Sequence, residues 1–134
     1  MSPLGFGKKV EKQAETTKAL SDLEQICGDD KEAYEALYHT MILDPKKVDT
    51  SLKDAVENAK RFEKEKNMTR ARIWYDIAGG LAIYEDNAKK VVELFSEAEK
   101  LSGIKYPILK NTEKAVAKAQ EYYKKYLKTE TVAA

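Results

Sequence analysis

Cysteine is almost absent from this sequence, because Cys27 is the only one in 134 residues. A single cysteine excludes an internal disulfide framework and suits a reducing compartment. A chain of this length buries roughly two-thirds of the surface that it exposes when unfolded, which is enough for one core. We therefore expect one helical domain over residues 1–128 and a disordered tail at residues 129–134.

Long apolar runs are also missing. No segment approaches the ~20 apolar residues that a membrane span requires. The opening stretch, "MSPLGFGKKVEKQ", lacks the apolar run of a signal peptide. We expect a cytoplasmic protein that does not act at a membrane.

An excess of charge of one sign is missing as well. The 24 Lys and Arg residues balance 23 Asp and Glu residues, so the net charge is +1 and attracts neither nucleic acid nor membrane over the whole molecule. Charged residues make up 35% of the chain, whereas Gln and Asn together number seven. This composition is typical of proteins from thermophiles.

Residues that could do chemistry are present but are not grouped. His39 is the only histidine, and no second histidine or cysteine cluster completes a metal site. Cys27 has no visible base as a partner, and we expect it to be a small buried apolar residue. The glycines of "PLGFGKK" lack the spacing of a phosphate-binding loop. The sequence thus favours a protein with no catalytic residues, metal or cofactor.

What the sequence does contain is helical periodicity. Almost every segment repeats its apolar residues every 3.6 positions, and none alternates as a β-strand does. The expected fold is all-α, a compact bundle of five or six antiparallel helices. The start and stop signals place these helices at about 9–27, from Asp29 or Asp30 to Asp44, from Ser51 to Asn67, from Thr69 to Tyr84, from Asp86 or Asn87 to Gly103, and from Asn111 or Thr112 to Lys128.

The fourth of these helices is apolar over most of its girth, which predicts a central position. Trp74, Ala78 and Leu81 define its main apolar arc, and Gly79 and Gly80 lie on the flanks of that arc. Glycine in a helix interior costs about 1 kcal/mol relative to alanine. We therefore expect the two glycines to be there because neighbouring helices approach closely; a kink or a ligand that approaches the bare backbone is the alternative.

The same helix and the next one share a spaced pattern of small and aromatic residues. Tyr75, Ala78 and Gly79 follow one another as aromatic, apolar and glycine, and the next helix carries Val91, Phe95 and Ala98. Residues 69–103 thereby resemble a single tetratricopeptide-repeat hairpin. A tandem repeat would place another glycine 34 residues before and after Gly79. Those positions hold Pro45 and Glu113, so the pattern is not repeated in tandem. The resemblance implies that the chain binds a peptide or a protein.

The function that we expect is therefore a non-catalytic protein–protein interaction or scaffold module, which binds a partner protein or a second copy of itself. A helical hairpin outside a repeat array can leave an apolar groove for an amphipathic helix. The candidate walls of that groove are Tyr75 and Ile83. Ile83 falls on the polar side of its helix, with Arg72 and Asp76, which are spaced for an ion pair.

An alternative function comes from the last helix, which is rich in lysine. Lys114, Lys118, Lys125 and Lys128 fall on one face, and Tyr122 lies beside them. Such a stripe suits weak, sequence-tolerant binding of nucleic acid, with tyrosine available for stacking. The helix contains no arginine, the residue that makes bidentate phosphate contacts. The lysines are equally compatible with a face that only keeps the helix soluble.

Overall fold

The computed structural model describes residues 20–40 and 48–127, and within these ranges the regular structure is helical, with no strand. The all-α prediction is therefore confirmed for this part of the chain. In chain order, the helices are residues 20–27, α2 (Lys31–Tyr38), α3 (Leu52–Lys64), α4 (Met68–Tyr84), α5 (Ala88–Ser102), the 3₁₀ turn η2 (Pro107–Leu109) and α6 (Thr112–Tyr126).

Short polar side chains cap α2, α3, α4 and α5, as expected from the orphan N–H groups of a first turn, whereas Asn111 before α6 makes no such bond. The Ser51 hydroxyl accepts the N–H of Asp54 at 3.1 Å, and Asp30 caps α2 in the same way. Gly103, in the left-handed region with φ 74°, ends α5 as predicted.

Two predicted helix boundaries are wrong. The cap of α4 is Asn67 rather than Thr69, and its Oδ1 accepts the N–H of Arg70 at 3.3 Å. The second helix ends at Tyr38, well before Asp44, and Thr40 turns its hydroxyl back onto the carbonyls of Ala36 and Leu37. The predicted stop at Asp44 lies outside the described residues.

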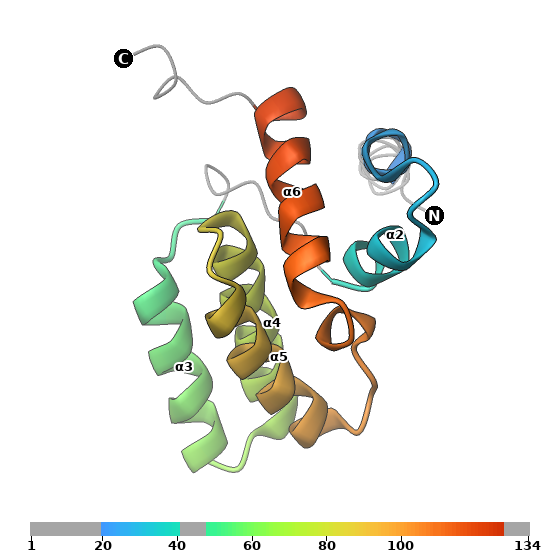
Figure 1. The fold of residues 1–134 in the computed structure, drawn as a ribbon. Helices are drawn as coiled ribbons and strands as arrows, with labels where there is room; N and C mark the ends of the chain where they lie inside the picture. The colour runs from blue at the N-terminus through green and yellow to red at the C-terminus, as the bar shows by residue number, and fades with distance from the viewer. Residues whose placement is uncertain (1–19, 41–47, 128–134) are drawn as a thin grey trace, which may run out of the picture.

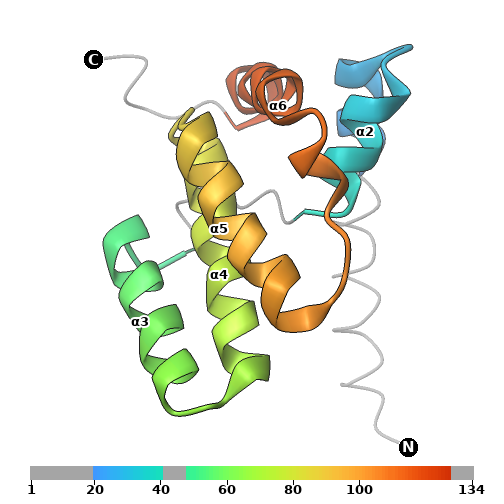
Figure 2. The ribbon, with the colours of Figure 1, turned by 60° about the horizontal axis from the view of Figure 1, so that its bottom comes forward.

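The turns on either side of α4 have the same backbone conformation. Lys66 in the first turn and Asp86 in the second have φ angles of 60° and 59°, in the left-handed region. The asparagine that follows each of them donates its backbone N–H to the carbonyl five residues earlier, at 2.9 and 3.0 Å. Each asparagine side chain then caps the next helix. These two turns lay α3, α4 and α5 side by side (Figure 2).

The middle helix of these three, α4, is central to the bundle, as predicted. It packs against α3, α5 and α6. Gly79 and Gly80 are both buried. A Cβ atom added to Gly79 would lie 2.5 Å from Cζ of Phe95, so close that the Phe95 ring or one of the two helices would have to shift. The packing role predicted for the glycines is confirmed for Gly79.

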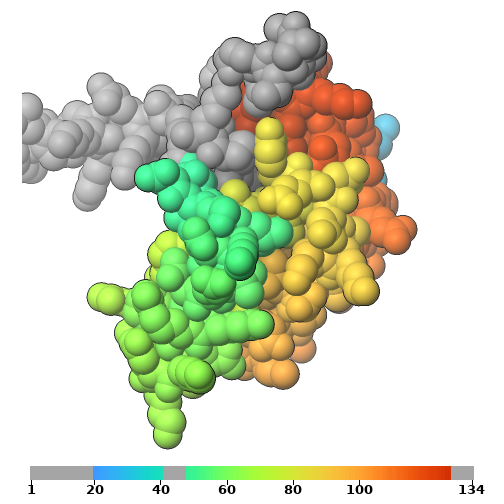
Figure 3. Space-filling view, turned by 90° about the vertical axis from the view of Figure 1, so that its left-hand side faces the viewer, coloured from blue at the N-terminus to red at the C-terminus, as the bar shows by residue number. Residues whose placement is uncertain are grey.

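The remaining helices lie on the other side of α4 and α5. Helix α6 runs between that pair and α2, whereas α3 is at the opposite edge (Figure 1). Seen from the α3 side, α3 lies beside the yellow and orange surface of α5 (Figure 3). This arrangement places α6 in contact with α4 and α5 on one side and with α2 on the other.

Candidate functional site on the lysine face of α6

Helix α6 carries buried side chains on two of its faces. Val116, Ala119 and Tyr123 are buried, and the Tyr123 ring meets that of Tyr84 of α4 edge-on, with centroids 5.0 Å apart. Ala115 and Tyr122 are buried as well. The sequence of α6 predicts one buried face. The helix has two, because α4 and α5 pack on one side of it and α2 packs on the other.

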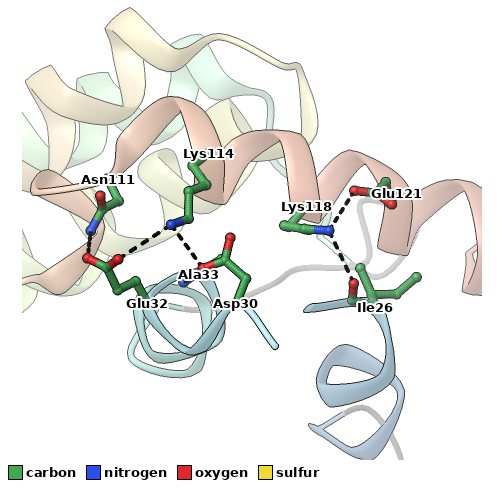
Figure 4. A network of polar contacts seen from close by, with 8 residues as sticks. All are labelled: Ile26, Asp30, Glu32, Ala33, Asn111, Lys114, Lys118 and Glu121. Carbon is green, nitrogen blue, oxygen red and sulfur yellow. Dashed lines mark hydrogen bonds and ion pairs between the residues drawn. The ribbon is translucent and has the colours of Figure 1, made fainter. Parts of the chain in front are cut away.

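Lys114, the first lysine on the lysine face of α6, is bound by the start of α2 (Figure 4). Lys114 Nζ lies 3.0 Å from Oδ1 of Asp30 and 3.5 Å from Oε1 of Glu32. Asn111 adds a hydrogen bond from its side-chain amide to the other oxygen of Glu32, at 3.1 Å. The hydrogen bond from Lys114 is the main cause that lowers the pKa of Asp30, and it raises the pKa of the lysine.

The next lysine along the face also points at the N-terminal helices (Figure 4). Lys118 Nζ donates to the carbonyl oxygen of Ile26 at 3.5 Å and pairs with Glu121 at 3.4 Å. Near the end of the helix, the Tyr126 hydroxyl donates to Oε1 of Gln25 at 3.1 Å. Together with the Lys114 contacts, these bonds fasten residues 25–32 along the length of α6.

The predicted nucleic-acid stripe is therefore not a free surface in this conformation. Lys114 and Lys118 bind groups of the same chain, and Tyr122 is only 6% exposed. Lys125 is exposed and lies over the ring of Tyr126, with Nζ 5.4 Å from the ring centroid. Lys128 lies outside the described residues. The placement of Tyr122 beside the lysines as a stacking surface is wrong, because α6 is covered on that side.

The predicted groove residues are also in the interior. Tyr75 is 3% exposed, and its hydroxyl donates to Oε1 of Glu63 in α3 at 2.8 Å. Ile83 is fully buried, so its placement on a polar side of α4 is wrong. The amide of Gln120 in α6 donates to the carbonyl of Ile83 at 2.7 Å, which shows that α6 closes this end of α4. Neither side chain lines a surface groove.

A polar cluster that the sequence showed only in part lies at the other end of α4. The predicted pair of Arg72 and Asp76 is present, with Nε and Oδ2 3.7 Å apart. The hydroxyl of Tyr106 joins them, since it donates to Asp76 at 2.7 Å and accepts from Arg72 at 3.2 Å. Burial raises the pKa of Asp76. Because Tyr106 also donates its N–H to Glu99, the cluster fastens the connection after α5.

An open hollow beside the start of α5 is the feature that sequence reasoning missed. Helical periodicity places Val92, with Val91 and Phe95, on the inner side of α5, but the structure leaves it 42% exposed. It lies in a surface hollow of about 630 Å³ between the beginnings of α5 and α6. Ala88 and Leu109 form apolar parts of its wall, and Lys89 and Lys110 are among the polar residues that line it. Only the tertiary position of α6 creates this hollow, so helical periodicity could not reveal it.

Other sites can be described briefly. Cys27 is buried, as predicted, and burial raises its pKa. His39 is exposed and lies against the ring of Tyr38. Within residues 20–40 and 48–127, no three His, Cys, Asp or Glu side chains are placed to share a metal ion. None of the described helices combines the length and apolar character needed to cross a membrane.

Comparisons with known proteins add no relative. A scan against known protein families finds no match, and neither the curated proteins nor the solved structures contain a significant one.

Proposed function

We propose that this protein is a non-catalytic interaction module that pairs with a second copy of itself through the exposed side of α5. The observation that carries the proposal is Val92, an apolar side chain that is 42% exposed within a hollow rather than on a convex surface. An apolar centre with a polar rim is the usual anatomy of a protein–protein contact.

The charges around Val92 favour a second copy as the partner. Lys89 precedes it by three positions and Glu93 follows it directly, and both are exposed. When two α5 helices pack antiparallel about a two-fold axis near Val92, the lysine of each helix approaches the glutamate of the other. A two-fold interface needs this self-complementarity, because the same patch serves both copies.

The resemblance of α4 and α5 to a tetratricopeptide-repeat hairpin remains part of the proposal. It is supported by the burial of all six pattern residues, namely Tyr75, Ala78, Gly79, Val91, Phe95 and Ala98. The close approach of Gly79 to Phe95 is the kind of contact that such a pattern specifies. Binding of a different protein partner is the corresponding alternative to self-association.

Light scattering across a concentration series tests the proposal. We expect the parent to form dimers and Val92→Lys to raise the dissociation constant by roughly tenfold or more, because it places a charge at the centre of the contact. Ile73→Lys is the matched control, since Ile73 is 49% exposed on a different helix. A parent that stays monomeric to millimolar concentration overturns the proposal.

Charge reversal tests the orientation. Lys89→Glu alone and Glu93→Lys alone should each weaken the dimer, because each places like charges opposite one another. The double reversal should recover most of the lost affinity. If the double variant is weaker than both single variants, the antiparallel arrangement of α5 is wrong.

A further inference from the structure

The N-terminal segment is attached to the rest of the described structure through a narrow set of elements. Among these elements, α2 packs on α6 and η2, whereas α3, α4 and α5 pack mainly on one another and on α6. Within the described residues, five polar contacts join this segment to α6 or its cap: Gln25 to Tyr126, Ile26 to Lys118, Asp30 to Lys114, and Glu32 to Lys114 and Asn111.

The apolar part of this attachment is modest. Only two of its five buried side chains, Leu23, Cys27, Ala33, Ala36 and Leu37, are leucine, and Ile26 and Tyr34 pack partly buried against the same core. Apolar stabilisation scales with the buried area, so alanine contributes little of it. The ion pairs of Lys114 add a second, polar part to this attachment, and it is partly open to solvent, since Lys114 is 42% and Glu32 69% exposed.

We propose that residues 20–40 form a cover that leaves α6 as a unit while α3–α6 remain folded, and that the ion pairs of Lys114 with Asp30 and Glu32 are its latch. Units held by few apolar contacts and exposed polar bonds open below the free energy of global unfolding. Opening frees Lys114 and Lys118 from their partners in residues 20–40. These two lysines of α6 are then available to an external ligand only in the open state.

The chain contains its own reporter of this opening. Cys27 is the only cysteine and is 3% exposed in the closed state, within the segment that is proposed to leave. Iodoacetamide is uncharged, so nearby lysines neither attract nor repel the reagent. Lys118 lowers and Asp30 raises the pKa of the thiol, so the rates of the variants are compared at a pH high enough to ionise the exposed thiol fully. We expect labelling under native conditions at a rate that rises with urea much less steeply than global unfolding does, because leaving α6 exposes only part of the buried surface.

Matched variants identify the latch. Asp30→Asn combined with Glu32→Gln removes the two carboxylates and keeps a capping side chain at residue 30. Its control, Asp29→Asn combined with Glu35→Gln, makes the same change of charge at exposed neighbours. We expect the first pair to speed Cys27 labelling about two- to fivefold, the range for a partly exposed ion pair, and the control to leave the rate unchanged.

The other side of the latch gives an independent check. Lys114→Met should speed labelling to a similar extent, whereas Lys124→Met, on the same helix and exposed, should not. Combining Lys114→Met with the Asp30 and Glu32 variant should add little, because both remove the same contacts.

Two results would overturn the proposal. The first is labelling of the parent that shows the full urea dependence of global unfolding, measured in parallel by circular dichroism. The second is additive acceleration when the two latch changes are combined, which would mean that the residues act separately.

Discussion

At the scale of single residues, a close contact between α4 and α5 depends on the absence of one side chain. A Cβ on Gly79 would meet Cζ of Phe95 at 2.5 Å. Gly79→Leu should lower the free energy of unfolding by about 1–3 kcal/mol, the usual cost of overpacking. Gly79→Ala should cost less, since alanine regains about 1 kcal/mol of helix propensity. Urea unfolding followed by circular dichroism measures both changes.

A compensating variant shows whether the clash is with Phe95. Phe95→Leu alone removes buried volume and should destabilise the protein, but in the Gly79→Ala background it also makes room for the new methyl group. The cost of the two changes together should therefore be smaller than the sum of their separate costs. A leucine variant at Gly79 that unfolds like the parent would show that the helices separate without loss.

Single residues also show where sequence reasoning reaches its limit. The burial of Gly79 followed from its position on an apolar helix, and that prediction is confirmed. Two other expectations are wrong. Ile83 was expected on the polar side of its helix but is buried, and Val92 was expected on an inner face but is 42% exposed. Periodicity locates the main apolar face of a helix, but α4 has three neighbours and α5 begins beside an open hollow. Burial beyond the main face depends on tertiary arrangement.

At the scale of elements, the two turns around α4 can be improved. Lys66 and Asp86 adopt φ angles near 60°, where a residue with a side chain loses roughly 1–2 kcal/mol. Glycine avoids that cost but loses about 0.5–1 kcal/mol through the greater freedom of the unfolded chain. Lys66→Gly and Asp86→Gly should each raise the free energy of unfolding by up to about 1 kcal/mol, which a shift of the urea midpoint measures.

The residues directly before Lys66 and Asp86 serve as controls for the effect of glycine at a position without strain. Glu65 and Glu85 have φ angles of −77° and −80°, which any residue adopts. Glu65→Gly and Glu85→Gly should therefore destabilise the protein by about 0.5–1 kcal/mol. If all four glycine variants shift the midpoint in the same direction, backbone strain at residues 66 and 86 is not what determines stability there.

The elements themselves were predictable where local signals exist. Ser51, Asn87 and Gly103 mark helix ends by hydrogen bonds within a few residues, and the structure has these ends where the sequence placed them. The role of the α6 lysines was not predictable in this way. The partners of Lys114 are Asp30 and Glu32, more than eighty residues earlier, and no local pattern relates them.

At the scale of the whole molecule, these internal ion pairs decide how the chain should behave toward nucleic acid. Each phosphate contact by a lysine releases about one counterion, so a free lysine stripe binds nucleic acid strongly at low salt. Here Lys114 and Lys118 are engaged and the net charge is only +1. We expect the parent, at micromolar concentration and ~50 mM salt, to retain neither duplex nor single-stranded DNA in a gel shift.

The last prediction follows from freeing that stripe. The Asp30→Asn and Glu32→Gln variant raises the net charge by two units and releases Lys114, so it should retain single-stranded DNA weakly. Three lysines, at residues 114, 118 and 125, imply a log–log salt slope of roughly −2 on single strands. The Asp29→Asn and Glu35→Gln variant has the same net charge and an intact latch, so its failure to bind would assign the gain to the uncovered face. Equal binding by both variants would instead mean that net charge alone governs the interaction, and that α6 has no special part in it.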